Sequence, residues 1–333
     1  MDARITKRRL SEMLQYDWIK IIGVIVAAIL IWELIFTMTA VRVSNGQNFK
    51  IYYYPTLSTN GTTELYDFLA EDAGLSYDVL EYNIETLDAT YGDTILGLRL
   101  TTGEGDIIMI DNEITHSEAE EHKDDPLYDS SNFYQMVDGY NMYSYDVLLS
   151  DAKEYIGSFM ENGYVENGAL VEEKVKENFL KRMKRDNRFR SAENKEKGLK
   201  QELERLETLK AAVADFDRLY TEYKDSGLFY RYVKYQMTVY TSEDVDDDYK
   251  AAYEKQLEKG ALPYAINAGY LDEYKKDNKS VSNVVSMAQG DNEGTAKNTA
   301  VMVFDFKEQQ PDLQYETVVF LTNFIKTYTT LLD

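Results

Sequence analysis

The first strong pattern along the chain is a continuous apolar run from Ile21 to Val41, in which Glu33 is the one charged residue. At about 1.5 Å per helical residue, a run of this length crosses the roughly 30 Å hydrocarbon core of a bilayer. A cleaved signal peptide is the alternative interpretation, but its apolar core has only ~7–15 residues. The pattern therefore predicts an uncleaved transmembrane anchor over residues 21–41, in contact with the lipid bilayer.

Basic residues are concentrated on the N-terminal side of this run, where they are Arg4, Lys7, Arg8, Arg9 and Lys20. Because lysine and arginine are retained on the cytoplasmic side, we expect a cytoplasmic tail over 1–20 and an extracellular remainder after residue 41. A carboxylate inside a bilayer is costly and often faces a partner. Glu33 is therefore a candidate contact for a membrane permease or sensor subunit, or else a protonated or snorkelling residue of a lone anchor.

After a polar connector, strand and helix patterns alternate. Strands are expected over Phe49–Tyr54, Tyr77–Ile84 and Asp106–Asp111, and helices over Glu64–Ala73 and Tyr91–Leu100. The third strand is a continuous apolar run, which is typical of a strand buried on both faces in a parallel sheet. The order predicts an α/β fold with right-handed βαβ crossovers.

Between residues 113 and 260 the pattern is helical, with helices expected over 150–185 and 192–237. In the second, apolar residues recur at helical spacing: Leu199, Leu203, Leu206, Val213, Phe216, Tyr220 and Tyr223. Such a stripe favours a long helix packed, as in a coiled coil, on an antiparallel partner. The expected partner face consists of Tyr155, Phe159, Val175, Phe179 and Met183. We therefore expect residues 113–260 to form a helical insertion, either a hairpin or a small bundle.

The α/β pattern returns after Gly260. A short strand is expected over Pro263–Ile266, another over Val301–Phe306, and a closing helix over Tyr315–Leu332. The predicted organisation is thus one α/β lobe built from residues 42–112 and 261–333, interrupted by the helical insertion and preceded by one transmembrane helix.

Composition narrows the functional classes. The chain has 59 acidic and 36 basic residues, a formal net charge of −23, which argues against a nucleic-acid partner. It has no cysteine, which excludes disulfides, thiolate metal sites, cysteine nucleophiles and lipoprotein acylation. Between Lys174 and Lys210 basic residues outnumber acidic ones. That segment is either a solvated helix surface with i, i+4 pairs, or a surface that docks on the acidic α/β lobe, on an anionic wall polymer or on lipid headgroups.

Catalytic and cofactor motifs are absent from the sequence, which has no GxSxG, HExxH or phosphate-binding glycine loop. Aspartates alternate in Ser242–Asp248 as in a calcium loop, but Tyr249 and Lys255 occupy the positions that need glycine and glutamate. Acids in the first turn of a helix explain this run better. We therefore expect no enzymatic activity, no cofactor and no metal site.

The segment Leu100–Asp111 ends a helix in Gly103-Glu104-Gly105, followed by an aspartate and a buried strand. Together with the strands at 49–54 and 77–84, it resembles the first lobe of extracellular solute-binding proteins of ABC importers. Pro263–Asn267 is similar to the return of the chain through the hinge of that family. The resemblance implies a periplasmic-binding-protein-like lobe with a ligand cleft. The second α/β lobe and the lipobox cysteine of the family are missing here, so the expected lobe is partial and capture by lobe closure is in doubt.

Ligands of open α/β sheets bind at the carboxyl ends of strands. Those ends supply Tyr54, Thr56, Asp111 and Asn112, whose ring, hydroxyl, carboxylate and amide groups suit a carbohydrate or peptide ligand. The alternative interpretation is that the strand tyrosines simply alternate between core and surface. We expect a membrane-anchored extracellular ligand-binding or accessory component of a transport or sensing system. The alternative is a non-enzymatic adaptor that uses the helical insertion and retains only a vestigial cleft.

Overall fold

The computed structural model describes residue 11 and residues 18–39, 43–124, 128–161, 165–166, 169–235, 247–276, 278–305 and 313–333. The chain divides into two compact units, Met1–Arg42 and Val43–Asp333. Several predictions concern positions outside the described residues. They are most of the N-terminal basic residues, the acidic run up to residue 246, and Phe306.

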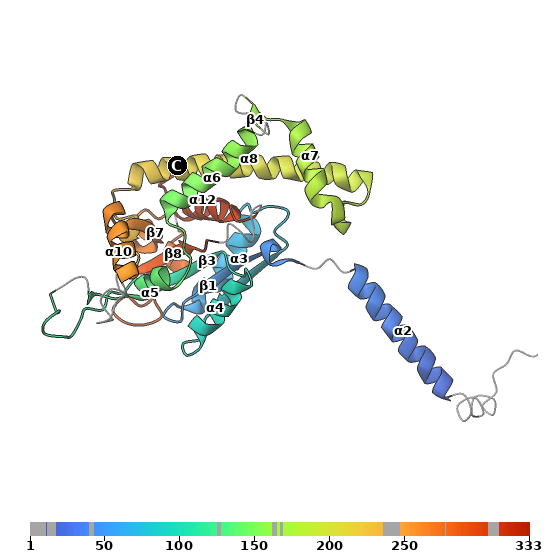
Figure 1. Cartoon of the computed structure of the whole chain (residues 1–333), viewed down its shortest axis with the longest axis horizontal. Helices are drawn as coiled ribbons and strands as arrows, with labels where there is room; N and C mark the ends of the chain where they lie inside the picture. The colour runs from blue at the N-terminus through green and yellow to red at the C-terminus, as the bar shows by residue number, and fades with distance from the viewer. Residues whose placement is uncertain are drawn as a thin grey trace, which may run out of the picture. The chain divides into compact units, whose positions relative to one another are not determined.

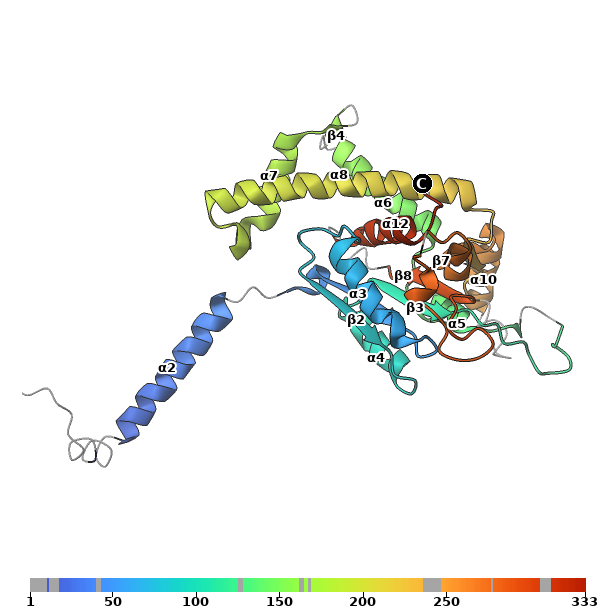
Figure 2. The ribbon, with the colours of Figure 1, turned by 180° about the vertical axis from the view of Figure 1, so that it is seen from behind.

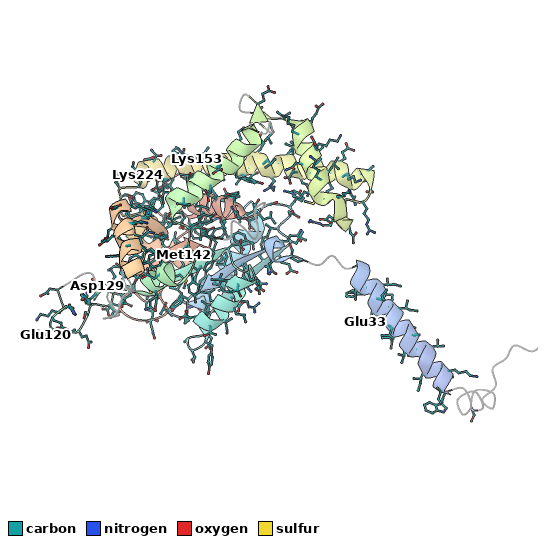
Figure 3. The ribbon with its side chains drawn as sticks, viewed as in Figure 1. Glu33, Glu120, Asp129, Met142, Lys153 and Lys224 are labelled. Carbon is teal, nitrogen blue, oxygen red and sulfur yellow. The ribbon has the colours of Figure 1, made fainter. Side chains whose placement is uncertain are left out.

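The described part of the first unit contains the helix α2, Trp18–Thr39. Within it, Trp18–Thr37 is long and apolar enough to cross a membrane. Glu33 lies on this helix with an exposed side chain (Figure 3). The prediction of an N-terminal apolar helix that could span a membrane is therefore confirmed at the level of length and composition.

The second unit is built on a six-stranded mixed sheet of order β2-β1-β3-β8-β7-β6 (Figures 1 and 2). The strands are β1 (Asn48–Tyr53), β2 (Glu81–Thr86), β3 (Ile107–Asp111), β6 (Phe229–Tyr232), β7 (Leu262–Asn267) and β8 (Thr299–Val303). Strand β1 pairs in parallel with β2 and β3, and the connections contain α3 (Thr62–Glu71) and α4 (Gly92–Thr101). The predicted βαβαβ order of this half is confirmed.

The other half of the sheet is antiparallel. Strand β8 pairs with β3 and with β7, and β7 pairs with β6. Strand β6 differs from the expected helix over 192–237. The helix ends at Tyr223, the turn Asp225-Ser226-Gly227 breaks it, and the aromatic-rich segment after the turn joins the sheet. A strand from the region expected to be a helical insertion therefore completes the α/β sheet.

The remaining helices pack around the sheet or, like α7, lie in an extension beside the first half of α8 (Figure 1). They are α5 (Asn132–Gly139), α6 (Tyr145–Glu161), α7 (Glu172–Arg182), α8 (Ala192–Tyr223), α10 (Asp247–Lys259), α11 (Ala268–Glu273) and α12 (Glu316–Tyr328). Short 3-10 turns include η1 (Asn45–Gln47), η4 (Met183–Arg185) and η5 (Asn187–Phe189), and β4 (Val165–Glu166) pairs with β5 (Ala169–Leu170) in a separate small sheet.

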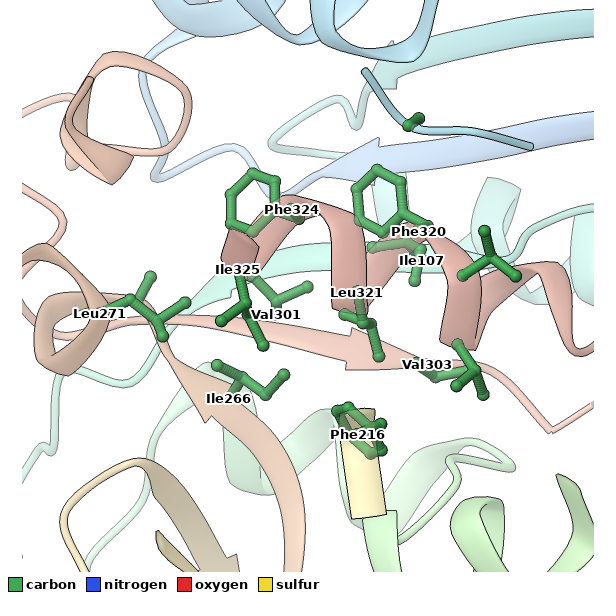
Figure 4. Packing of buried hydrophobic residues seen from close by; sticks show 14 of the residues in the cluster. Ile107, Phe216, Ile266, Leu271, Val301, Val303, Phe320, Leu321, Phe324 and Ile325 are labelled. Atoms are coloured by element: carbon green, nitrogen blue, oxygen red, sulfur yellow. The ribbon is translucent and has the colours of Figure 1, made fainter. Parts of the chain in front are cut away.

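Both faces of the sheet are covered by helices, so alternate strand residues enter two different cores. On one face, Ile107, Val301 and Val303 pack with α3, α8 and α12. Figure 4 shows Leu321 and Ile325 of α12 beside Val301, with Phe216 of α8 nearby. On the other face, Ile108, Ile110 and Met302 pack with α4 and α5. This three-layer arrangement explains why β3 is apolar at every position between its ends.

Helix α8 belongs to the core in its second half and to a separate hairpin in its first half. Leu209, Val213 and Phe216 enter the main core, whereas Leu199 and Leu206 pack on Val175 and Phe179 of α7. We call residues 172–206 the arm. Gly198 lets the arm close, because a Cβ there would lie 2.5 Å from the Phe189 ring and 2.6 Å from the Phe179 ring. Helix α7 therefore covers only the first half of α8.

Candidate functional site

The predicted strand-end site brings its residues together. Asp111 ends β3, and the amide of Tyr54 donates to the carbonyl of Met109 at 2.9 Å. The Asp111 carboxylate accepts hydrogen bonds from the Thr56 hydroxyl and from Asn132 Nδ2, the latter at 2.8 Å. Its other oxygen accepts from the backbone amide of Glu113 at 3.3 Å. Asp111 is only 3% exposed, and its recorded donors are all neutral groups of the protein itself.

Asn112 is also occupied by protein groups. Its side-chain oxygen accepts from the Ser131 hydroxyl at 2.8 Å, and its backbone amide donates to the backbone carbonyl of Asn298 at 2.7 Å. Ser131 in turn accepts from the amide of Tyr134 and caps α5. The strand end is thus joined to the first turn of a helix and to a loop, as a structural junction would be.

The strand tyrosines do not alternate between core and surface. Tyr52 and Tyr53 are both fully buried, on opposite faces of the sheet, and the Tyr53 hydroxyl donates to the carbonyl of Val284 at 2.8 Å. Tyr54 is half-buried, and burial, with further effects of Asp93 and Asp111, raises its pKa to about 12. Only Tyr54 thus keeps a partly accessible ring beside Asp111.

A second polar cluster lies where α8 crosses α12, and sequence reasoning did not find it. At its centre, Arg205 is 5% exposed. Its guanidinium donates to Glu202 at 3.2 Å, to Glu316 at 3.4 Å and to the Tyr155 hydroxyl at 3.2 Å. Glu316, in the first turn of α12, is 2% exposed. We call Glu202, Arg205 and Glu316 the ion cluster.

The ion cluster connects the arm to the loop between α3 and β2. Arg182 of α7 and the Tyr77 hydroxyl both donate to Glu202 Oε2, at 2.6 and 2.7 Å. The amide of Ser76 donates to Glu316 Oε2 at 3.0 Å. Each buried charge therefore has at least one charged partner and one further hydrogen bond, which a buried ion pair requires.

The two carboxylates of the cluster respond differently to burial. Burial raises the pKa of Glu202, but Arg205 and Arg182 more than offset it, so the pKa lies below its usual value. For Glu316, burial outweighs the same kind of attraction from Arg205, and the pKa is raised. Glu202, with two arginines, is thus the better compensated anion of the two.

Several pockets border the ion cluster and the arm. One of ≈ 330 Å³ is bordered by Ser76, Tyr77, Arg205 and Glu316. Two others, of ≈ 280 and ≈ 520 Å³, both have Phe189 of the arm in their lining. Within the described ranges, no three His, Asp or Glu side chains are grouped so that they could hold a metal ion.

A sequence signal for the ion cluster existed. Glu202 and Arg205 are one turn apart beside the apolar stripe, next to Leu203 and Leu206, so a buried charged pair was readable from helical spacing. Glu316 carried no signal, because an acid in the first turn of a helix is common on surfaces.

Comparison with known proteins gives no relative. No family model matches the chain, and no curated protein and no solved structure is detectably similar to it.

Proposed function

We propose that this chain is a membrane-anchored interaction subunit of a transport or sensing system, with residues 1–20 cytoplasmic and the unit Val43–Asp333 outside the cell membrane. The observation that carries the proposal is the state of Asp111. A ligand-binding carboxylate needs accessible acceptor sites, whereas Asp111 is only 3% exposed and already accepts bonds from Thr56, Asn132 and Glu113. The adaptor with a vestigial cleft therefore fits better than a solute binder.

The transport or sensing setting is supported by the resemblance to one lobe of solute-binding proteins. The pieces that carry it are β1 to β3 with their two helices, and the returning strand β7. The described residues between 113 and 260 supply helices, the short β4–β5 pair and β6, which joins the same sheet. They form no second α/β lobe, so a partial lobe that holds a helical arm is the form we propose.

The fastening of the arm supports a role in presenting a surface. An arm that merely filled space would need only apolar contacts. In this one, Arg182 joins α7 to Glu202 of α8, and Arg188 joins the arm to Asp78. All four side chains are less than one-fifth exposed. Charged pairs in such settings fix geometry more than they add stability. The arm is thus a defined platform for a protein partner.

Site-specific cross-linking in the native cell tests the proposal. A photoreactive amino acid replaces Leu180 on α7, Glu33 on α2 or, as a control, Val147 on α6; all three side chains are exposed. We expect Leu180 and Glu33 to yield discrete adducts with integral membrane proteins of a transport or sensing complex, identified by mass spectrometry, and Val147 to yield none. The absence of adducts from both test positions would contradict the proposal.

A solute-binding component is the second candidate, favoured by the convergence of Tyr54, Thr56 and Asp111 at one strand end. Thermal-shift screening of the full chain in detergent against sugars and short peptides tests it. A saturable shift that is lost in Asp111→Ala, and retained in the exposed control Asp291→Ala, would favour the binder over the interaction subunit.

A further inference from the structure

The ≈ 520 Å³ pocket of the arm has an apolar interior and a basic border. Phe179, Met183 and Phe189 are its buried lining residues, and Leu180 lies at its edge with an exposed side chain. A pocket of this size holds a small ligand or part of a larger one. The lining therefore suits a chain of methylene groups.

Three cations complete the lining, Lys184, Arg190 and Lys195, all with exposed side chains. None of the three forms an ion pair with another described residue. The one acid of the lining, Asp186, is engaged by Arg188 at 2.6 Å. In a chain of net charge −23, this is a local concentration of free positive charge around an apolar hollow. Its complement is an anionic amphiphile.

Contacts inside the unit Val43–Asp333 link the pocket to the first residues of that unit, which follow α2 in the chain. Asp78 Oδ1 accepts from Gln47 Nε2 at 2.9 Å and also from Arg188 Nη2. Gln47 belongs to η1, at the start of the unit, and Arg188 to η5, which borders the pocket. Six peptide steps separate Thr39 from Asn45, at most about 20 Å of extended chain. A bilayer that holds α2 is therefore within reach of this end.

We propose that the arm pocket binds an anionic phospholipid of the bilayer in which α2 is anchored, with Lys184, Arg190 and Lys195 around the phosphate and Phe179, Met183 and Phe189 against the first acyl carbons. Basic residues near an anionic membrane surface each contribute about 1 kcal/mol of attraction, which salt weakens. The apolar lining adds a contribution that salt does not weaken. The inference rests on the membrane anchoring in the proposed function, but not on any protein partner.

The absence of cysteine from the chain makes a clean fluorescence test possible. The full chain carries one environment-sensitive label, at Glu193→Cys between the pocket residues Arg190 and Lys195, or at Asp291→Cys as a control. Asp291 lies in the loop that follows Met287. In this loop the Ala288 amide donates to the carbonyl of Thr56, just after β1, at 2.9 Å. The loop is therefore at the opposite end of β1 from Gln47, which precedes the strand. The protein is placed in nanodiscs of phosphatidylcholine, with or without phosphatidylglycerol, containing headgroup-quenching lipid.

We expect strong quenching at position 193 and little at 291 when phosphatidylglycerol is present. The triple variant Lys184→Gln, Arg190→Gln, Lys195→Gln should reduce quenching at 193 to its level in pure phosphatidylcholine. The matched variant Lys123→Gln, Lys255→Gln, Lys297→Gln removes the same charge from exposed positions elsewhere and should leave it unchanged.

Equal quenching at the two positions, no dependence on phosphatidylglycerol, or equal loss in both triple variants would each overturn the lipid proposal. Failure of the anchor itself is distinguishable, because the chain would then be recovered outside the discs. In that case the released chain is mixed with phosphatidylglycerol vesicles, and a silent label at 193 would again overturn the lipid proposal.

Discussion

Two of the regions in which the folded unit buries carboxylates compensate them in opposite ways. Around Asp111, at the carboxyl end of β3, the donors are neutral: a threonine hydroxyl, an asparagine amide and a backbone amide. Around Glu202 and Glu316, where α8 crosses α12, the principal donors are arginines. The first region joins the end of β3 to the loop after β1 and to the start of α5. The second joins elements that are farther apart in sequence.

This difference predicts how much stability the protein loses when a donor is removed from each region. A neutral donor can be removed while the others continue to solvate the carboxylate. Removing the central arginine of an ion cluster leaves two buried anions without their main partner. We therefore expect the ion cluster to control the stability of the arm and its attachment, and the Asp111 junction to be the more tolerant region.

The largest expected effect is that of Arg205→Met, which keeps the volume but removes the charge between Glu202 and Glu316. Breaking a buried ion pair from one side costs about 3–5 kcal/mol. Urea unfolding of the full chain in detergent, followed by circular dichroism, should show this loss. Lys181→Met on the arm surface, where Lys181 pairs with exposed Glu177 at 2.7 Å, is the control and should change stability by less than about 0.5 kcal/mol. Equal losses would remove the distinction between the regions.

The second effect concerns Asp106, at the other end of β3 from Asp111. Burial, with a smaller contribution from the charge of Glu316, raises its pKa to about 7, against the opposing hydrogen bond from the Lys50 amide. Its carboxyl group keeps a proton in the folded state that the unfolded chain releases near pH 4. The fold is therefore penalised progressively as pH rises from about 4 to 7.

Asp106→Asn removes this penalty and can still accept from the Lys50 amide. We expect the variant to gain about 2 kcal/mol relative to the natural chain at pH 8, but little at pH 4.5, seen as a difference of roughly 5 °C in midpoint between the two pH values. Asp291→Asn in an exposed loop is the matched control. A gain that is the same at both pH values would show that Asp106 does not titrate in this range.

The third effect separates local from global stability. Arg182→Gln removes the charged bond from α7 to Glu202 of α8 but leaves Arg205 in place. We expect global stability to fall by only about 1 kcal/mol, because Glu202 retains one arginine and Tyr77. Amide exchange in α7 should accelerate roughly fivefold, as expected for a local opening favoured by the same amount. Exchange in β1, β3 and β8 should stay unchanged; if it accelerates equally, the arm and the sheet open as one unit.

The contrast between the regions also explains what could be predicted from the sequence. The run Ile107–Ile110 identifies a buried strand, and a parallel order follows from the alternating strands and helices, so the position of Asp111 at a strand end was accessible. Its partner Asn132 was not, because it follows a long loop whose path no local pattern fixes. Strand β6 is not predicted because the helix expected over 192–237 continues past Ser226-Gly227, although such a pair often marks a turn.

The ion cluster shows more clearly which features local sequence patterns cannot predict. Ser76 and Glu316 are joined by a hydrogen bond although 240 positions separate them. Neither residue differs locally from a surface residue of its kind. Their burial results from the sheet order, which brings the closing helix α12 back over β1, and that order emerges only when all six strands are assembled.

The smallest expected effect is that of Thr56→Val, which tests how tolerant the Asp111 junction is. The variant loses one hydroxyl donor, but Asn132 and the Glu113 amide still bond to the carboxylate. We expect a loss of about 1 kcal/mol or less in urea unfolding, with Thr56→Ser near zero because it retains the hydroxyl. A loss for Thr56→Val as large as that of Arg205→Met would mean that Asp111 depends on one donor. A ligand group could then take the place of that donor, which would contradict the proposal that the cleft is vestigial.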